Sequence, residues 1–197
     1  MISTDTNQAK HPASSLYDLV ELLVIAICTV LLIFSFGFRL CKVSGDSMNQ
    51  TLQNGEMLLI SNVAYTPKQG DIVVFHQTHE ARTDLNEPIV KRVIATEGQF
   101  VQIDFLSAKV YVSDDDVFDD NEVLEESYAY LMGGRMFPSY PTVQSWPIPD
   151  GCVFVLGDNR NNSLDSRSNE IGCVDTRRIL GKVVLRITPF SEFGVVN

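Results

Sequence analysis

Histidine is scarce in this chain of 197 residues, which holds only His11, His76 and His79. His11 precedes a long apolar run, and no carboxylate stands beside the other two at the spacing of a familiar zinc motif. We therefore interpret His76 and His79 as surface residues and predict no metal site. A serine–histidine–aspartate triad has little support, so a nucleophilic serine would need another base.

Basic residues are also few: Lys and Arg total 15 against 25 Asp and Glu, which gives a formal net charge of −10. Such a chain repels phosphate backbones, and this argues against nucleic acid as a partner. The acidic excess is concentrated between Asp114 and Glu126, a run without a basic residue. We interpret this run as a solvated loop. A docking surface for basic substrates or for calcium is the alternative, although the regular EF-hand spacing is lacking.

Long hydrophobic runs are limited to one, from Leu22 to Phe38, with 17 residues and no charge. This length is at the short end for a membrane-spanning helix. A cleaved signal peptide is the competing interpretation, but no small-x-small site follows directly, because the chain continues as Arg39-Leu40-Cys41-Lys42. We predict a retained transmembrane anchor at residues 19–41. The few Lys and Arg residues near its ends leave its orientation undecided.

Cysteine is limited to four residues. Cys28 lies inside the apolar run and Cys41 lies at its end, so no metal cluster of familiar spacing arises. Cys152 and Cys173 could form a disulfide if the domain is extracytoplasmic. The sequence does not show whether their Cα atoms approach closely enough, and both states stay open.

After residue 42 no long stretch has apolar residues repeating with the 3.6-residue period of a helix. Short apolar runs separated by turn residues predict strands instead. The alternation across residues 101–112 predicts a hairpin. The fold class is therefore mainly β, with folded sheets or an open barrel, over residues 42–197. Residues 113–150, with their acidic run, two adjacent glycines and four prolines, are predicted to be an insertion or a long loop. The predicted strands are 57–60, 72–75, 89–96, 101–105, 110–112, 153–156 and 179–187.

Two residues are candidates for nucleophilic chemistry. Ser47 lies in the stretch GDSMNQTL, just beyond the predicted anchor, and Lys91 lies in the apolar run IVKRVI. Most lysines in strands point to solvent. Burial in an apolar site would lower the amine pKa from ~10.4 to about 8, disfavouring the ammonium by roughly 3 kcal/mol. A lysine that is neutral in this way can activate a serine.

A third polar stretch, Gly157–Arg167, reads GDNRNNSLDSR and follows a buried-looking strand. Its two Asp and two Arg residues favour ion pairs within one tight loop, which an ordinary polar loop does not need. Together with GDSMNQTL, QGDIVVF at 69–75 and IVKRVIA at 89–95, it resembles the ordered sequence boxes of bacterial type I signal peptidases (leader peptidases, peptidase family S26). The single short anchor and the Gly-Asp before the serine are similar to the Gram-positive branch.

The resemblance implies a membrane-anchored serine endopeptidase that cleaves N-terminal signal peptides from exported pre-proteins at small-x-small sites, without a cofactor. It implies residues 1–18 as a short cytoplasmic N-terminus, and a catalytic domain on the extracytoplasmic face of the cell membrane. The implied partners are signal peptides, membrane lipid and the secretion translocon. Ser47 stands five residues past Lys42, so an extended chain places it at most about 17 Å from the end of the anchor. A signal peptide is cut near its apolar region, which confines the scissile bond to the same layer.

The resemblance also implies roles for individual residues. Ser47 is the nucleophile, Lys91 is the general base, and Ser163 hydrogen-bonds the lysine amine. The Ser47 N–H is one oxyanion donor; many relatives have a hydroxyl for the second at the position of Gly45, for which Ser44 is a substitute. The residues expected to brace the site by ion pairing are Asp158, Arg160, Asp165, Arg167 and Arg92. The residues expected to bind the substrate as an added strand are Val43, Met48, Ile89 and Val90.

Two departures and two alternatives remain at this point. Gln50 replaces a usual proline after the serine, which loosens the turn, and Glu97 and Gln99 flank Gly98 where relatives have Pro-Gly-Asp. One alternative is a non-catalytic or specialised relative that assists assembly of pili or surface proteins. Such a protein would be expected to lose the serine or the lysine. The other, a self-cleaving repressor, would need a DNA-binding module where this chain has its apolar run.

Overall fold

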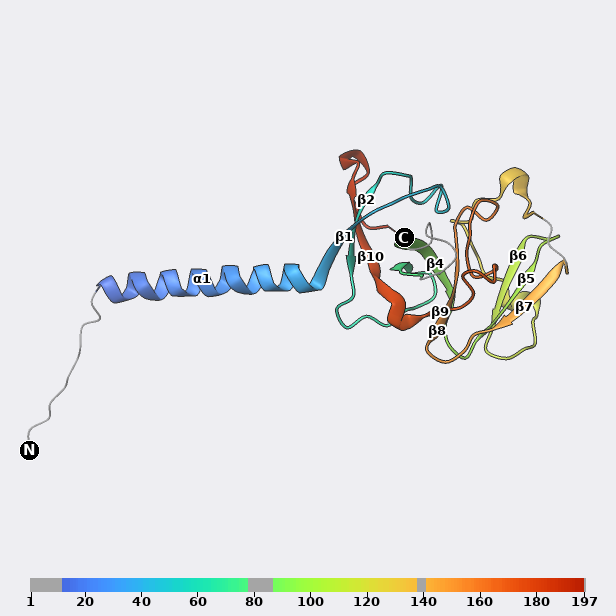
Figure 1. The fold of residues 1–197 in the computed structure, drawn as a ribbon, viewed down its shortest axis with the longest axis horizontal. Coiled ribbons are helices and arrows are strands. Elements are labelled where there is room, and N and C mark those ends of the chain that lie inside the picture. Colours follow the sequence, from blue (N-terminus) through green and yellow to red (C-terminus); the bar gives the residue numbers. More distant parts are fainter. Residues whose placement is uncertain (1–11, 78–86, 138–140, 197) are drawn as a thin grey trace, which may run out of the picture. The chain divides into compact units, whose positions relative to one another are not determined.

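The computed structural model describes residues 12–77, 87–137 and 141–196, and the chain divides into two units, Met1–Phe38 and Arg39–Asn197. The first unit contains helix α1 (Pro12–Gly37), drawn in Figure 1. Its described side chains from 16 to 32 are all exposed. Among the described residues, no helix combines the length and apolarity that crossing a membrane requires. Because α1 ends at Gly37, the last residues of the predicted anchor belong to strand β1 (Phe38–Lys42).

Strands are the main regular secondary structure of the second unit, and the prediction of a mainly β fold is confirmed. Seven strands form one sheet in the order β1-β2-β10-β3-β4-β8-β9, which is open at β1 and β9. A second sheet has three strands in the order β6-β5-β7. The remaining bounds in the larger sheet are β2 (Met57–Ser61), β3 (Ile72–Phe75), β4 (Ile89–Ala95), β8 (Cys152–Leu156), β9 (Val174–Asp175) and β10 (Ile179–Thr188). Those in the smaller sheet are β5 (Phe100–Asp104), β6 (Lys109–Ser113) and β7 (Val143–Pro147).

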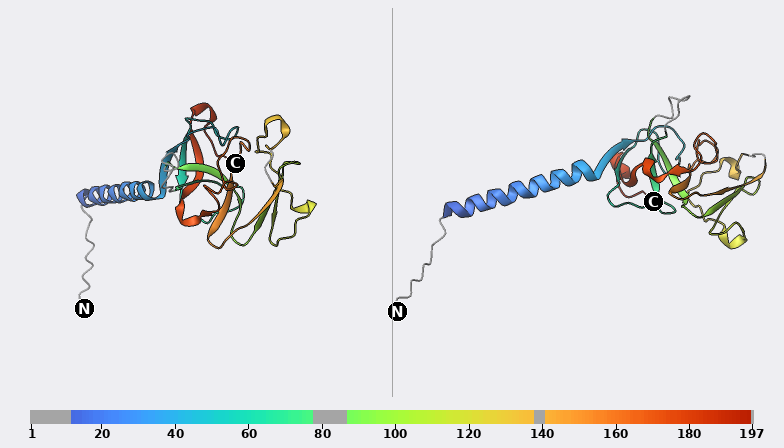
Figure 2. Two further views of the ribbon diagram at one scale, coloured as in Figure 1. Left: turned by 45° about the vertical axis from the view of Figure 1, so that its right-hand side comes forward. Right: turned by 60° about the horizontal axis from the view of Figure 1, so that its bottom comes forward.

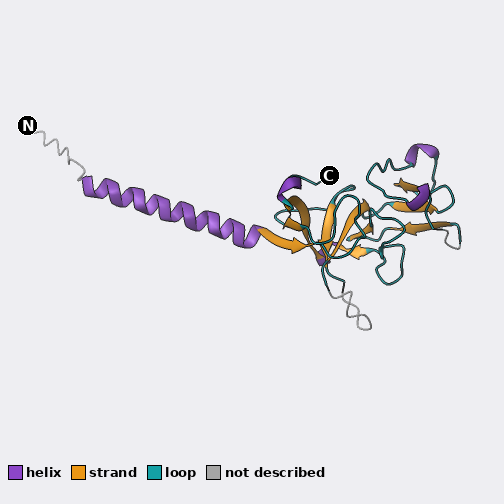
Figure 3. Cartoon of the chain, turned by 90° about the horizontal axis from the view of Figure 1, so that it is seen from above, coloured by secondary structure: helices purple, strands orange, loops and turns teal. Residues whose placement is uncertain are grey.

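The smaller sheet lies at one end of the second unit, as two turned views agree (Figure 2). Apart from α1, the described helices are single 3₁₀ turns in the segments between or after strands (Figure 3). They are η2 (Asp120–Glu122), η3 (Met132–Gly134), η4 (Thr176–Arg178) and η5 (Phe190–Glu192).

Each predicted strand is present within one or two residues, and the predicted hairpin is the antiparallel pair of β5 with β6. Three strands were not predicted. β1 was assigned to the anchor, β9 has only two residues, and β7 lies in the range interpreted as an insertion or long loop. β7 pairs with β5 along its whole length, and Trp146 places its ring 5.2 Å from that of Phe154. Part of the 113–150 range therefore belongs to the folded core.

Strand β3 is buried on both faces, which explains its unbroken apolar sequence. Ile72 and Val74 pack into one core cluster, whereas Val73 and Phe75 pack into another. Its neighbour β4 pairs with it in antiparallel register, Val73 opposite Lys91 and Ile72 opposite Arg92. Strand β4 is also buried, so both of its cationic side chains enter the interior from opposite faces.

Candidate active site

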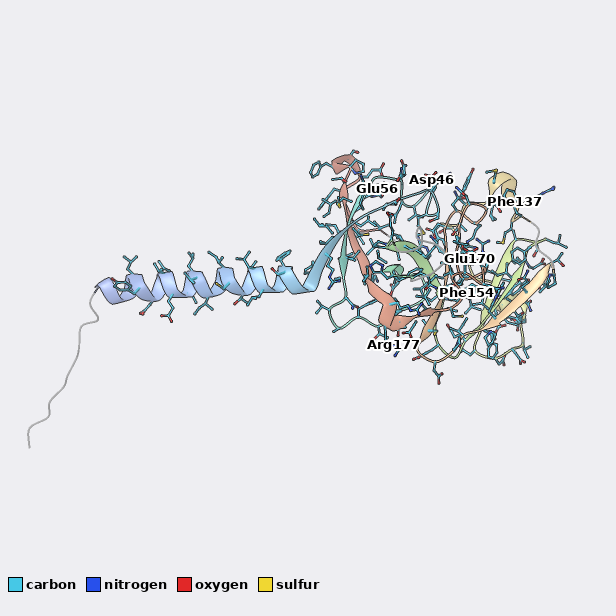
Figure 4. The ribbon with its side chains drawn as sticks, in the orientation of Figure 1. Asp46, Glu56, Phe137, Phe154, Glu170 and Arg177 are labelled. Carbon is cyan, nitrogen blue, oxygen red and sulfur yellow. The ribbon has the colours of Figure 1, made fainter. Side chains whose placement is uncertain are left out.

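The Ser47 loop, residues 43–56, connects β1 to β2 and is fixed by apolar anchors on either side of its turn. Met48 and Leu52 are 1% and 0% exposed and pack into the cluster that contains Ile72 and Val74. Full burial of a leucine contributes about 2 kcal/mol. The Leu52 N–H donates to the Met48 carbonyl at 2.9 Å, closing the turn that follows Ser47. Figure 4 labels Asp46, the residue directly before the serine.

Gly45 adopts φ +85°, in the left-handed region where side chains are strained. A serine or threonine at this position would therefore cost stability, which is a physical reason for glycine here. Ser44 lines the same pocket as Ser47. Its hydroxyl stays a prediction as the second oxyanion donor.

The structure brings Ser47 and Lys91 together although 44 residues separate them in sequence. The Lys91 Nζ lies 2.7 Å from the Ser47 Oγ and donates to the Val90 carbonyl at 2.9 Å. The Lys91 residue is 3% exposed. No carboxylate of the described residues forms an ion pair with it.

Burial is the main influence on the Lys91 amine. It lowers the pKa to about 8, against attraction from Asp165 and Asp158, which raises it. At neutral pH a usable fraction of the amine is then unprotonated, which an exposed lysine does not provide. Lys91 can therefore accept a proton from the adjacent hydroxyl.

Arg92, the next residue of β4, forms an ion pair on the opposite face. Its guanidinium donates to both carboxylate oxygens of Asp158 at 2.9 and 2.8 Å, and both side chains are almost fully buried. The Asp158 carboxylate also accepts the Thr51 hydroxyl at 2.5 Å. This pair thus connects β4, the Gly157–Arg167 loop and the Ser47 loop.

The Gly157–Arg167 loop contains only one of the predicted internal ion pairs, that between Asp165 and Arg167, with two contacts of 2.8 Å. The Asp165 carboxylate also accepts the Gly157 N–H at 3.0 Å. Burial disfavours its ionised form, but the hydrogen bond and charge of Arg167 together with the Gly157 N–H outweigh that cost, and the pKa lies below its ordinary value. Arg160 pairs with Glu126, outside the loop, rather than with an aspartate inside it. The prediction for Arg160 was wrong in its partner, because a distant segment folds against the loop.

Ser163 does not make the contact predicted for it. Its buried hydroxyl makes no hydrogen bond of ordinary geometry among the described residues, although it lies close enough to the Asp165 carboxylate to help lower the pKa of that group. It lies against Gly157, where an added Cβ would come within 2.2 Å of the Ser163 Oγ. The Lys91 amine is held by Ser47 and a backbone carbonyl instead.

A pocket of about 130 Å³ opens beside the Ser47 and Lys91 side chains. All four residues predicted to bind substrate line it: Val43, Met48, Ile89 and Val90. Its size suits a small side chain. Strand β4 and the Ser47 loop flank it, so an extended peptide placed there would run beside two backbone segments.

Sequence-based prediction did not identify several residues around the site. The sequence predicts Glu126 as part of a solvated acidic run, and no motif or spacing indicates a role for Tyr128, Thr51 or Asn159. The Tyr128 ring lies 3.9 Å from the Arg92 guanidinium carbon, and Asn159 donates to the backbone of the Ser47 loop. Outside the site, Cys152 and Cys173 are free thiols, and His79 falls outside the described residues.

A serine hydroxyl within hydrogen-bond distance of a buried lysine, beside a pocket for an extended chain, is the arrangement of a serine hydrolase with a lysine base. The family model for signal peptidase, peptidase S26, matches residues 16–188. The chain belongs to this family.

Curated relatives of similar length carry signal peptidase names. A probable signal peptidase I-1 of Synechocystis is 34% identical, covering 89% of this chain and 84% of that protein. The signal peptidase I of Bacillus caldolyticus is also 34% identical, covering 86% and 90%. Signal peptidase IB of Staphylococcus aureus is 31% identical, covering 87% and 88%. The crystal structure of a signal peptidase I from Enterococcus faecalis aligns with TM-score 0.43 and 24% identity, over 60% of this chain and 97% of that one.

Proposed function

We propose that this chain is a membrane-anchored serine endopeptidase that removes N-terminal signal peptides from exported pre-proteins, with Ser47 as nucleophile and Lys91 as general base. The observation that carries the proposal is the 2.7 Å separation of the Lys91 Nζ and the Ser47 Oγ in a site where Lys91 is 3% exposed. Membership of the signal peptidase family supports the substrate class.

In the acylation step, the neutral Lys91 amine takes the Ser47 proton while the Ser47 Oγ attacks the scissile carbonyl carbon. The resulting ammonium gives a proton to the leaving amine, and the N-terminal segment stays attached as an ester. Lys91 then deprotonates a water molecule that hydrolyses this ester and regenerates the serine. The Ser47 N–H, which donates to no acceptor among the described residues, is suited to stabilise the oxyanion of each step.

Substrate selection follows from the pocket beside the site. Its volume of about 130 Å³ accepts a small side chain, in keeping with cleavage at small-x-small sites. The Val43 and Val90 segments that border it supply an edge to which an extended substrate adds as a strand. Alternate side chains of such a strand point to the same face, so two small residues separated by one are recognised together.

Membrane anchoring is the part of the proposal that rests on sequence. The uncharged run from Leu22 to Phe38 and the short connection to Ser47 keep the site near a bilayer surface, where signal peptides are held. With its catalytic domain on the extracytoplasmic face, the protein meets membrane lipid and the secretion translocon. Detergent-dependent extraction of the full chain from cells, compared with release of residues 39–197 by aqueous buffer, tests this point.

The experiment that tests the activity uses the full chain in detergent with a model pre-protein. Ser47→Ala and Lys91→Ala are expected to abolish cleavage, because each removes one partner of the only proton transfer that starts the reaction. Lys109→Ala is the control, since Lys109 lies on the surface and pairs with Asp120. Circular dichroism checks that each variant is folded. Cleavage retained by a folded Ser47→Ala or Lys91→Ala variant would refute the assignment.

A further inference from the structure

The segment Glu126–Tyr130, here called the brace, follows β6 and precedes β7 in the sequence. Its first residue, Glu126, is the last residue of the acidic run. Most of that run is solvent-exposed, including Asp114, Asp115 and Asp116. Glu126 differs: its carboxylate accepts from both terminal nitrogens of Arg160, and the two side chains are 9% and 1% exposed. A bidentate pair removed from water is a strong and directional contact. The brace is thus joined to the Gly157–Arg167 loop by a buried ion pair.

The backbone of the brace also pairs with this loop. The Tyr130 N–H donates to the Asp158 carbonyl at 2.7 Å, and the Arg160 N–H donates to the Tyr130 carbonyl at 3.1 Å. Asn159, which lies between Asp158 and Arg160 in the sequence, contacts the Ser47 loop instead of the brace. Its N–H donates to the Ser47 carbonyl and its side-chain amide to the Asp46 carbonyl, both at 3.0 Å. Three chain segments therefore lie side by side, with the loop between the brace and Ser47.

A second connection runs through Tyr128. Its ring covers the Arg92 guanidinium at 3.9 Å, and its hydroxyl donates to Glu126 at 3.1 Å. A cation over an aromatic face is stabilised by the ring, most strongly where water is excluded. Arg92 in turn orients Asp158, which accepts the Thr51 hydroxyl from the turn after Ser47. Both connections from the brace end at the Ser47 loop.

We propose that the brace is a positioning element for the nucleophile: Glu126 and Tyr128 fix the Asp158–Arg160 backbone, and Asn159 transmits that position to Ser47. This inference rests on the proposed function and deepens it. Glu126 and Tyr128 touch neither the Ser47 hydroxyl nor the Lys91 amine, so they are positioning residues. Displacing a nucleophile by tenths of an ångström lowers turnover much more than it lowers substrate binding.

The test compares Glu126→Gln with Glu125→Gln in the full chain in detergent. Glu125 is the adjacent residue, is exposed and undergoes the same loss of charge. We expect Glu126→Gln to lower kcat by about tenfold and to leave KM within about twofold, because the misplaced group is the nucleophile and not the pocket. Glu125→Gln is expected to match the wild type. Equal kcat in the two variants would overturn the proposal, as would a loss confined to KM.

A milder variant covers the case in which Glu126→Gln does not fold. Tyr128→Phe keeps the ring over Arg92 and removes only the hydroxyl that donates to Glu126. We expect a kcat about threefold below wild type, again with KM unchanged. An unchanged kcat in this variant, with Glu126→Gln unfolded, counts against the proposal.

Hydrogen exchange separates this inference from the proposed function, because it needs no substrate. In Glu126→Gln, the amides of residues 46–52 are expected to exchange about tenfold faster than in Glu125→Gln, since the backbone that holds Ser47 is loosened. Equal exchange there would overturn the inference even if cleavage is confirmed. If the wild-type chain cleaves no pre-protein, the proposed function fails, while the exchange comparison still decides whether the brace positions Ser47.

Discussion

The two faces of strand β4 treat a buried cation in opposite ways. On one face Lys91 meets a hydroxyl and a backbone carbonyl. On the other face Arg92 meets the Asp158 carboxylate and the Tyr128 ring. The two residues are neighbours in sequence and are 3% and 2% exposed. Burial alone therefore does not determine whether a buried cationic group loses its proton or keeps its charge. The groups in contact with it determine this.

The Lys91 face favours loss of a proton, because no paired carboxylate compensates the cost of burying an ammonium. The Arg92 face keeps its charge, since a guanidinium does not deprotonate and a bidentate carboxylate offsets its desolvation. One strand thus holds a titratable amine for chemistry and a permanent charge for structure. The predictions below disturb each face in turn.

The largest effect is expected for Lys91→Met, a variant of similar shape without the amine. Cleavage should be lost, because no group remains to accept the serine proton. Stability at pH 7 should nevertheless rise. The shift of the Lys91 pKa from 10.5 to about 8 corresponds to a burial penalty of roughly 3 kcal/mol, reduced to about 1–2 kcal/mol by the two hydrogen bonds lost.

The sign of this stability effect depends on pH. Below pH 8 the amine is charged in both folded and unfolded chains, so the penalty is fully present. Between pH 8 and 10.5 the Lys91 amine is mostly neutral in the folded chain and mostly protonated in the unfolded chain. The stability of the wild type therefore rises with pH over this range. Thermal unfolding of both proteins at several pH values measures the difference. A Lys91→Met protein less stable than wild type at pH 7 would contradict this account of the Lys91 face.

On the Arg92 face, Asp158→Asn is expected to cost about 3–5 kcal/mol of unfolding free energy, because it leaves a buried guanidinium without its counter-charge. Denaturant unfolding measures this loss. Asp120→Asn is the matched control: its pair with Lys109 is exposed and screened by water and salt, so its loss should leave stability close to that of the wild type. Similar losses in the two variants would show that the buried pair is no stronger than a surface one.

Gly157→Ala tests the contact between the Gly157–Arg167 loop and Ser47. An added Cβ would lie 2.5 Å from the Ser47 carbonyl oxygen and 2.2 Å from the Ser163 Oγ, so backbone must move. We expect kcat to fall by about a hundredfold and stability to fall by about 1–3 kcal/mol. Gly194→Ala, where nothing lies within 4 Å of the new atom, is expected to change neither. Wild-type turnover in Gly157→Ala would mean that Ser47 tolerates a shifted neighbour.

The sequence predicted the strands well because each is a short apolar run bounded by turn residues, as in β3 and β8. It missed β7, whose sequence VQSWP has two adjacent polar residues and so is not an unbroken apolar run, and whose pairing with β5 is decided by tertiary contact. The Ser47–Lys91 contact could be predicted from resemblance to family motifs. The partner of Arg160 could not, because Glu126 is one of several acidic residues in its run and only the folded chain shows which is buried.

The same limit applies to Ser163. The motif predicts a hydroxyl near the lysine, but whether it reaches the amine depends on a side-chain distance that no sequence pattern fixes. In the structure the Lys91 Nζ has two other partners, and the Ser163 hydroxyl is buried against Gly157. The structure also gives a reason for Gly45 that the motif comparison did not supply, since its φ of +85° suits glycine.

The smallest effect is expected in the pH dependence of wild-type cleavage, for which an arginine at position 91 provides the comparison. With a Lys91 pKa of about 8, kcat/KM should rise about tenfold between pH 7 and pH 9 and then level off, because the neutral amine is the active form. Lys91→Arg should be inactive throughout, since a guanidinium stays protonated over this range. Initial rates with a peptide substrate at saturating detergent measure both profiles. A midpoint near ~10.4 would mean that the amine titrates as in water and that burial does not set its basicity.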